Sequence, residues 1–114
     1  MQKTDIGGLE QRIGYSFKNK NILKEALTHS SYANELKARK QEAVCNERLE
    51  FLGDAVLSIV VSDAIFKDYT NLPEGELTRI RASLVCEKSL YGFAMQINLG
   101  DYLMLGKGEK EAAK

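Results

Sequence analysis

The 114-residue sequence is poor in cysteine, histidine and proline, and each shortage narrows what the protein can be. Cys45 and Cys86 lie far apart with no C-x-x-C pair, and there is one histidine, so neither a zinc site nor a disulfide framework is indicated. We expect both cysteines to be free thiols, buried or idle. The single proline, Pro73, marks the clearest break between helical segments.

Long hydrophobic runs are also missing. No apolar stretch approaches the roughly 20 residues that span a bilayer, and the opening MQKTDIGGLEQR lacks an apolar signal core. We therefore expect a cytoplasmic protein with no membrane partner. Hydrophobic residues make up 44% and charged residues 28% of the chain, so we expect one ordinary globular domain with a modest core.

The net charge is zero, but the charges are distributed unevenly. Residues 1–41 hold eight Lys/Arg and four Asp/Glu (+4), residues 42–76 hold two and eight (−6), and residues 77–114 hold six and four (+2). Phosphate neutralisation supplies most non-specific affinity for nucleic acids, so a protein that bound a nucleic acid strongly by itself would be clearly basic. This chain is not, so any strong binding of a nucleic acid would need cations from another part of the protein.

Apolar residues recur at helical spacing through most of the chain, and few segments alternate as strands do. One apolar face follows the polar turn at 19–21, where Asn19 or Asn21 is a possible helix cap. Others cover residues 77–85 and 90–97. We predict an all-α fold.

Three further segments complete the helical prediction. Residues 33–45 are polar and basic, and they indicate a fraying helix end or an exposed loop. One long helix is predicted from Asn46, its favoured cap, to about Tyr69. The closing residues 103–114 are small and charged, which is typical of the edge of a loop.

The long predicted helix begins with NERLEFLGDA, residues 46–55, in which Glu47, Glu50 and Asp54 are spaced three and four residues apart. At about 100° per residue the three acids share an arc of about 60°. Like charges at this spacing weaken an isolated helix, so the arc is typical of a site for a positive ligand. Carboxylate oxygens suit Mg²⁺, with Mn²⁺ as a substitute. The plainer alternative is a solvated acidic face.

Phe51 and Leu57 flank this arc, so the helix is apolar nearly all round, and we expect it to be central in the fold. Gly53 inside it costs about 1 kcal/mol relative to alanine and predicts the close approach of another chain or element. His29, the only histidine, is better explained as a helix-terminal residue stabilised by the dipole or satisfied locally than as a general base.

The segment NERLEFLGDA resembles the signature of the ribonuclease III endonuclease domain, which cuts double-stranded RNA, and it is most similar to the bacterial enzymes. IGYSFKNKNILKEALTHSSY (residues 13–32) resembles the opening helices of that family, and LPEGELTRIRASLVCEKSL (residues 72–90) resembles its next segment. The resemblance covers nearly the whole chain and implies the helical ribonuclease III fold.

In that family a later helix carries an Asp-x-x-Glu pair that completes the metal site, and this sequence contains no Asp-x-x-Glu. We therefore expect residues 1–114 to be the N-terminal part of a nuclease domain, incomplete at its C-terminal end and without the double-stranded-RNA-binding domain that usually follows in the family. The chain alone is expected to be inactive.

The resemblance also assigns residues. It implies that Glu50 and Asp54 are inner metal ligands and that Glu47 and Asp54 act in catalysis, with Glu47 either engaging substrate or providing a further metal position. It implies that Glu74 is a further ligand, whereas its position after Pro73 alone indicates only a favourable first-turn residue of a helix.

Three other residues have open roles. Asn46, Arg48 and Arg81 either contact RNA or hold the structure together. A helix cap is favoured for Asn46, and ion pairs with the acidic helix are favoured over phosphate contacts for Arg48 and Arg81.

The implied activity is hydrolysis of double-stranded RNA by a homodimer in which each subunit cuts one strand. The products carry 5′-phosphate and 3′-hydroxyl ends with short 3′ overhangs. A bound divalent ion supplies the charge stabilisation and the activated water that such hydrolysis requires. The alternative is a non-catalytic helical module for dimerisation or for scaffolding RNA.

Overall fold

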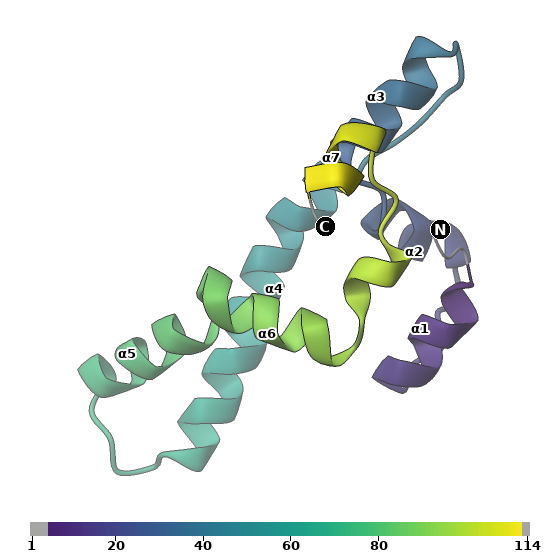
Figure 1. The fold of residues 1–114 in the computed structure, drawn as a ribbon. Helices are drawn as coiled ribbons and strands as arrows, with labels where there is room; N and C mark the ends of the chain where they lie inside the picture. The colour runs from purple at the N-terminus through teal and green to yellow at the C-terminus, as the bar shows by residue number, and fades with distance from the viewer. Residues whose placement is uncertain (1–4, 113–114) are drawn as a thin grey trace.

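The computed structural model describes residues 5–112, and helices make up its architecture (Figure 1). Within that range no strand forms, and the only β-type pairing is an isolated bridge between Thr28 and Met104. The all-α prediction is confirmed. The helices are α1 (Ile6–Ile13), α2 (Lys20–Ala26), α3 (Ser30–Ala38), α4 (Glu47–Asp68), α5 (Glu74–Leu84), α6 (Glu87–Gln96), the 3-10 helix η1 (Leu99–Tyr102) and α7 (Lys107–Ala112).

The predicted boundaries agree with most of these helices. The long helix α4 ends at Asp68, one residue before the predicted Tyr69. The predicted cap at Asn19 is confirmed, because its Oδ1 accepts the N–H of Asn21 at 3.0 Å. Residues 33–45 are divided between the end of α3 and the loop that follows it, so both parts of that prediction hold.

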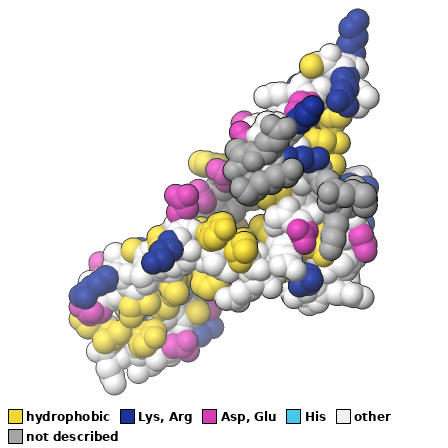
Figure 2. All heavy atoms as spheres, viewed as in Figure 1, with side chains coloured by type: hydrophobic (Ala, Val, Ile, Leu, Met, Phe, Trp, Pro, Cys, Tyr) yellow, Lys and Arg dark blue, Asp and Glu magenta, His cyan; other side chains and the backbone are white. Residues whose placement is uncertain are grey.

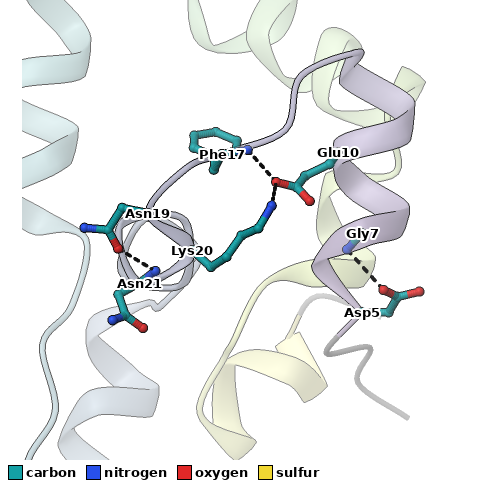
Figure 3. A network of polar contacts seen from close by, with 7 residues as sticks. All are labelled: Asp5, Gly7, Glu10, Phe17, Asn19, Lys20 and Asn21. Atoms are coloured by element: carbon teal, nitrogen blue, oxygen red, sulfur yellow. Dashed lines mark hydrogen bonds and ion pairs between the residues drawn. The ribbon is translucent and has the colours of Figure 1, made fainter.

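A buried carboxylate connects α1 to α2 (Figure 3). Glu10 is 8% exposed, and its Oε2 accepts the N–H of Phe17 at 2.6 Å and the Nζ of Lys20 at 2.5 Å. These hydrogen bonds, that from Lys20 first, hold the pKa of Glu10 below its ordinary value of 4.5. The ion pair therefore fixes α2 against α1 at neutral pH.

The main buried cluster lies where α1 and α2 meet the C-terminal part of the chain. Leu9, Leu23, Leu27 and Tyr102 are each at most 6% exposed and pack together. Partly buried residues surround them, namely Ile6, Phe17, Ile97, Leu99 and Leu103. We call this group the α1–α2–η1 cluster.

The prediction that α4 is central is wrong for this structure. Its single buried residue is Ile65, and Phe51 is 82% exposed. Among the described helices α5 packs along α4, so most of the apolar circumference of α4 faces solvent. The exposed apolar side chains of α4 are Phe51, Leu52, Val56, Ile59, Val60 and Phe66, and we call them the α4 apolar face.

The segment before α7 crosses the start of α3. The N–H of Gly106 donates to Ser31 Oγ at 2.8 Å, and the N–H of Lys107 donates to Glu35 Oε2 at 2.6 Å. A Cβ at Gly106 would lie 2.8 Å from the same Glu35 oxygen, so glycine fits this close approach. The loop prediction for 103–114 is therefore wrong over Lys107–Ala112, where these contacts begin a short helix.

None of the described helices combines the length and the apolarity that crossing a membrane requires.

Candidate functional site

The start of α4 is held by long-range backbone contacts. The N–H of Asn46 donates to the Thr28 carbonyl at 2.9 Å, and its Nδ2 donates to the Ala26 carbonyl at 3.1 Å. Asn46 occupies the predicted N-cap position of α4, but its side chain makes no cap hydrogen bond to the first turn of the helix. Its side chain instead anchors the beginning of the helix to the end of α2.

The three acids of the predicted arc lie on the first turns of α4, directly after this anchor. Glu47, Glu50 and Asp54 are all exposed. Among the described residues none of their carboxylates accepts a hydrogen bond or pairs with a cation. By contrast, Asp63 further along α4 pairs with Lys67 at 3.0 Å. The carboxylates of the arc are therefore free to bind an external cation.

An open cleft of about 660 Å³ lies beside the start of α4. Glu47 and Arg48 line it, whereas Glu50 and Asp54 do not. The other lining residues are Glu25, Val44, Cys45, Leu49, Phe51 and Leu52. The cleft thus combines one acid and one cation of the predicted site with part of the α4 apolar face.

Glu74 lies apart from the acidic arc. It begins α5, which follows the C-terminal end of α4. Asp68 lies fourteen positions after Asp54 on α4, which corresponds to roughly 20 Å at 1.5 Å per residue. Within residues 5–112, no group of three or more Asp, Glu, His or Cys side chains is arranged to hold a metal ion. Within one chain, Glu50 and Asp54 are therefore an incomplete ligand set.

Arg81 has a structural contact. Its guanidinium donates to Ser62 Oγ at 2.9 Å and so connects α5 to α4. Neither Arg81 nor the exposed Arg48 makes an ion pair with a described acidic residue, so the ion-pair form of the prediction is wrong for both. Arg81 still has a structural role, which it fulfils through its hydrogen bond to the Ser62 hydroxyl.

The predictions for Gly53 and His29 can both be compared with the structure. A Cβ built at Gly53 would meet nothing within 4 Å, so no described element of this chain approaches it. His29 precedes α3, and its Nδ1 accepts the N–H of Ser31 at 3.1 Å, which confirms local satisfaction.

The two cysteines are free, and neither is fully buried. Cys86 is exposed at the start of α6, where a hydrogen bond with the Ser89 hydroxyl and nearby backbone amides hold the pKa of its thiol below 9.0. The S-x-x-C-x-x-S spacing of Ser83, Cys86 and Ser89 is the sequence signal that accompanies this environment.

Comparison with known proteins gives consistent matches. A family model described as Ribonuclease-III-like matches residues 19–114. Ribonuclease 3 of Oceanobacillus iheyensis is 53% identical over 107 residues, which cover 94% of this chain and 46% of that protein. Ribonuclease 3 of Caldanaerobacter subterraneus subsp. tengcongensis is 55% identical over 102 residues, covering 90% and 43%. The chain thus spans less than half the length of these relatives.

Two solved structures of the ribonuclease III nuclease domain from Campylobacter jejuni have the same fold. One, which concerns structural flexibility in a region involved in dimer formation, matches with a TM-score of 0.83 and 42% identity over 96% of this chain and 71% of that one. The other matches with a TM-score of 0.82 and 41% identity over 97% and 70%. The chain therefore belongs to the ribonuclease III family and has the helical fold of its nuclease domain.

Proposed function

We propose that this chain is part of an endoribonuclease that hydrolyses double-stranded RNA with a divalent metal ion. The observation that carries the proposal is the group of unpaired, exposed carboxylates at the start of α4, within the segment that resembles the family signature. Family membership supports ribonuclease chemistry, and the relatives that span twice this length are named Ribonuclease 3.

The donor set fits part of a magnesium site. Glu50 and Asp54 lie one helical turn apart, and no described cation or hydrogen-bond donor occupies their oxygens. Hard carboxylate oxygens suit Mg²⁺, or Mn²⁺ in its place, and water completes an octahedron when protein ligands are few. We propose that these two residues hold the ion and that further acids complete the site.

The other predicted residues have supporting parts in this proposal. A bound divalent ion would stabilise charge on the phosphate oxygens and lower the pKa of a water molecule near neutral pH. Glu47, in the cleft beside α4, would engage substrate or water at the edge of the site, with Arg48 next to it. Asn46 keeps the first turn in place. Glu74 remains a proposed ligand, although within one chain it lies apart from Asp54.

We also propose that the chain forms a homodimer through the α4 apolar face. Isolated exposed apolar residues are ordinary, but six large ones on one helix are apolar surface that association would bury. Gly53 lies in the same segment, and the open space above its backbone leaves room for a second chain. The description of a Campylobacter jejuni nuclease domain refers to dimer formation, which supports this assignment.

The proposed reaction leaves 5′-phosphate and 3′-hydroxyl ends with short 3′ overhangs. The test is cleavage of a labelled RNA duplex in Mg²⁺, with and without chelator, by this chain and by a version extended through an Asp-x-x-Glu helix. We expect only the extended protein to cut, since Glu50 and Asp54 alone are an incomplete ligand set. Efficient cutting by residues 1–114 would contradict the incomplete site, and no cutting by either would contradict the enzyme assignment.

The second candidate is a non-catalytic dimerisation or RNA-scaffold module. The described residues favour it in one respect, because no group of three metal-ligating side chains forms among them. Glu50→Gln in the extended protein separates the two. A nuclease loses cleavage and keeps RNA binding, whereas a scaffold keeps its function and gains helix stability from the lost repulsion. Asp63→Asn is the matched control on the same helix, because Asp63 pairs with Lys67.

A further inference from the structure

A chain of hydrogen bonds joins the only histidine to the segment before α7. His29 lies at the N-cap position of α3, and its Nδ1 accepts the N–H of Ser31 at 3.1 Å. The Ser31 hydroxyl oxygen lies 2.8 Å from the same Nδ1 and accepts the N–H of Gly106, also at 2.8 Å. An Nδ1 that accepts carries no hydrogen, so the hydroxyl is the donor to the ring.

This arrangement requires a neutral imidazole. Both contacts with Ser31 use the lone pair of Nδ1, and a protonated ring has a hydrogen on each nitrogen and no lone pair. Two N–H groups would then face each other with their nitrogens 3.1 Å apart. The proton would also place a positive charge at the N-terminal end of α3, where the helix dipole disfavours cations. The ring of His29 therefore has to turn away when it binds a proton.

The segment 104–107 is held on α3 at both of its ends. The Met104 carbonyl accepts the N–H of His29 at 3.0 Å. The N–H of Lys107 donates to Glu35 Oε2 at 2.6 Å. The hydrogen bonds that run through the imidazole lie between these two contacts, and they are the part of the attachment that a proton breaks.

The backbone just before His29 also supports the start of α4. The carbonyls of Ala26 and Thr28 accept the side-chain and backbone N–H groups of Asn46 at 3.1 Å and 2.9 Å. The Leu27 carbonyl between them accepts the N–H of Met104 at 2.8 Å. One short stretch of backbone thus contacts both the segment 104–107 and the first turn of α4. Releasing the segment therefore removes a support of that turn.

The charges around His29 do not hold a proton on its ring. Among the described residues, the acids on α2, α3, α7 and the first turn of α4 are Glu25, Glu35, Glu47 and Glu109. The cations nearest to them in sequence are Lys24, Arg48, Lys107 and Lys110. None of these acids forms an ion pair with the imidazole. Charges of both signs are visible over α3 and α7 in Figure 2, so neither sign dominates there.

We propose that His29 is a proton-sensitive latch. Its neutral imidazole holds the segment 104–107 on α3, and a proton on Nδ1 releases that segment and loosens the start of α4. Histidine suits this role because its charge ordinarily changes between about pH 5 and 8. The inference goes beyond the proposed function and does not depend on it, since its test involves neither cleavage nor a metal ion.

The test follows the backbone amides of the isotope-labelled chain from about pH 7.5 to about pH 5.5, within the range in which histidine changes its charge. We expect the resonances of Gly106 and Asn46 to move together with the ring protons of His29. The heteronuclear Overhauser effect at Gly106 should fall as the segment becomes mobile. The amides of Leu9 and Leu23, in the α1–α2–η1 cluster, are the internal control and should keep their order.

His29→Asn removes the proton and keeps the cap. The asparagine oxygen can accept the Ser31 N–H, as it does at many helix N-termini, and the side chain has no basic nitrogen. We expect Gly106 to stay ordered over the whole pH range in this variant. Glu35→Gln is the matched control on the same helix, because its amide oxygen still accepts the Lys107 N–H. Its pH response should equal that of the parent chain.

Ser31→Ala interrupts the hydrogen bonds in their middle. It removes the acceptor of the Gly106 N–H, so the segment should be mobile at both ends of the pH range. If His29→Asn fails to hold the segment even at neutral pH, this variant carries the test. The parent chain at about pH 5.5 must then match Ser31→Ala at about pH 7.5 in the Overhauser effect at Gly106, and a parent that stays ordered would overturn the latch.

Four other results would contradict the proposal. The first is a Gly106 resonance that does not follow the ring protons of His29. The second is an undiminished pH response in His29→Asn, and the third is its loss in Glu35→Gln. The fourth is a simultaneous loss of order at Leu9 and Leu23, which would mean that the whole chain unfolds. A response at Gly106 with none at Asn46 would overturn the connection to α4.

Discussion

The two parts of this molecule bury their apolar side chains very differently. In the α1–α2–η1 cluster, Leu9, Leu23, Leu27 and Tyr102 are at most 6% exposed, and the Glu10–Lys20 pair joins the first two helices. In the α4–α5 pair, Ile65 alone is buried on α4, and Phe51 and Ile59 are 82% and 70% exposed. One part is stabilised within the chain, and the other presents apolar surface outward.

The acidic arc lies at the boundary between the packed part of the molecule and the exposed α4–α5 pair. The first turn of α4 is tied by Asn46 to the end of α2, so the acids that follow are supported by the packed part. The rest of α4 extends away from it (Figure 1). Rigid support on one side and an open face on the other suit the proposed metal site and the proposed dimer face.

The largest expected effect concerns the packed part. Leu27→Ala removes a side chain that is 5% exposed, and we expect the free energy of unfolding to fall by about 2–5 kcal/mol. Leu52→Ala is the matched change on α4, where the side chain is 57% exposed, and it should cost less than about 0.5 kcal/mol in dilute solution. Urea unfolding measures both. Equal losses in dilute chain would show that α4 is buried in solution in a way that the structure lacks.

The next effect concerns self-association through the α4 apolar face. Phe51→Ser should weaken a homodimer by about 2 kcal/mol or more, because exposed aromatic residues often dominate interfaces. Tyr91→Ser on α6 is the control, since Tyr91 is also well exposed, at 67%. Sedimentation equilibrium at several chain concentrations gives the association constant. A parent chain that stays monomeric at high concentration would contradict the proposed dimer face.

Asn46→Ala tests the connection between the two parts. Losing the 3.1 Å hydrogen bond to the Ala26 carbonyl should cost about 1 kcal/mol and increase hydrogen exchange at the first turns of α4. Exchange in α5 should stay unchanged. If the protection of Glu50 and its neighbours is unaffected, Asn46 does not position the acids.

Gly53→Ala has opposite effects on the monomer and the dimer. Alanine favours the helix, and nothing lies within 4 Å of the new Cβ, so the dilute chain should gain about 0.5–1 kcal/mol. If a second chain approaches this backbone closely, the same methyl group weakens association. Thermal unfolding and sedimentation together measure the two effects, and an unchanged association constant would rule out close backbone contact at Gly53.

The smallest expected effect is the pH dependence of the packed part. The pKa of Glu10 is lowered in the folded state, so its contribution to stability is present above pH 4.5 and is lost as the pH falls through the folded pKa. Glu10→Gln should reduce stability at neutral pH and flatten this acid-range decline. Denaturant titrations of both chains over that pH range test it. An equally steep decline in the variant would assign the pH dependence to other acids.

The sequence predicted the helices better than their surroundings. Periodicity located α4 to within one residue at each end because that signal is local. The same pattern, apolar nearly all round, could not show whether other elements of this chain cover the helix. The contacts of Gly106 and Lys107 with Ser31 and Glu35 join positions 75 and 72 residues apart, so no local pattern predicted α7.

Local sequence patterns predicted the candidate site only in part, because they do not reveal contacts between distant residues. The acidic arc followed from spacing along one helix, and the structure places its three acids together on the first turns of α4. The side-chain partner of Asn46 lies 20 residues earlier, beyond the reach of the local capping rule. The separation of Glu74 from Asp54 depends on the path between α4 and α5, which residue spacing does not determine.

The most direct test of the central claim is Mn²⁺ binding to this chain, measured by paramagnetic broadening of assigned amide resonances. The account predicts weak binding that broadens residues 50–54 first and is lost in Glu50→Gln and in Asp54→Asn, while Asp63→Asn leaves it unchanged. Asp63 is the internal reference because its carboxylate is paired with Lys67. Broadening that begins around Asp63 and Asp68, or that survives both substitutions in the arc, would contradict the assignment of Glu50 and Asp54 as the metal-binding pair.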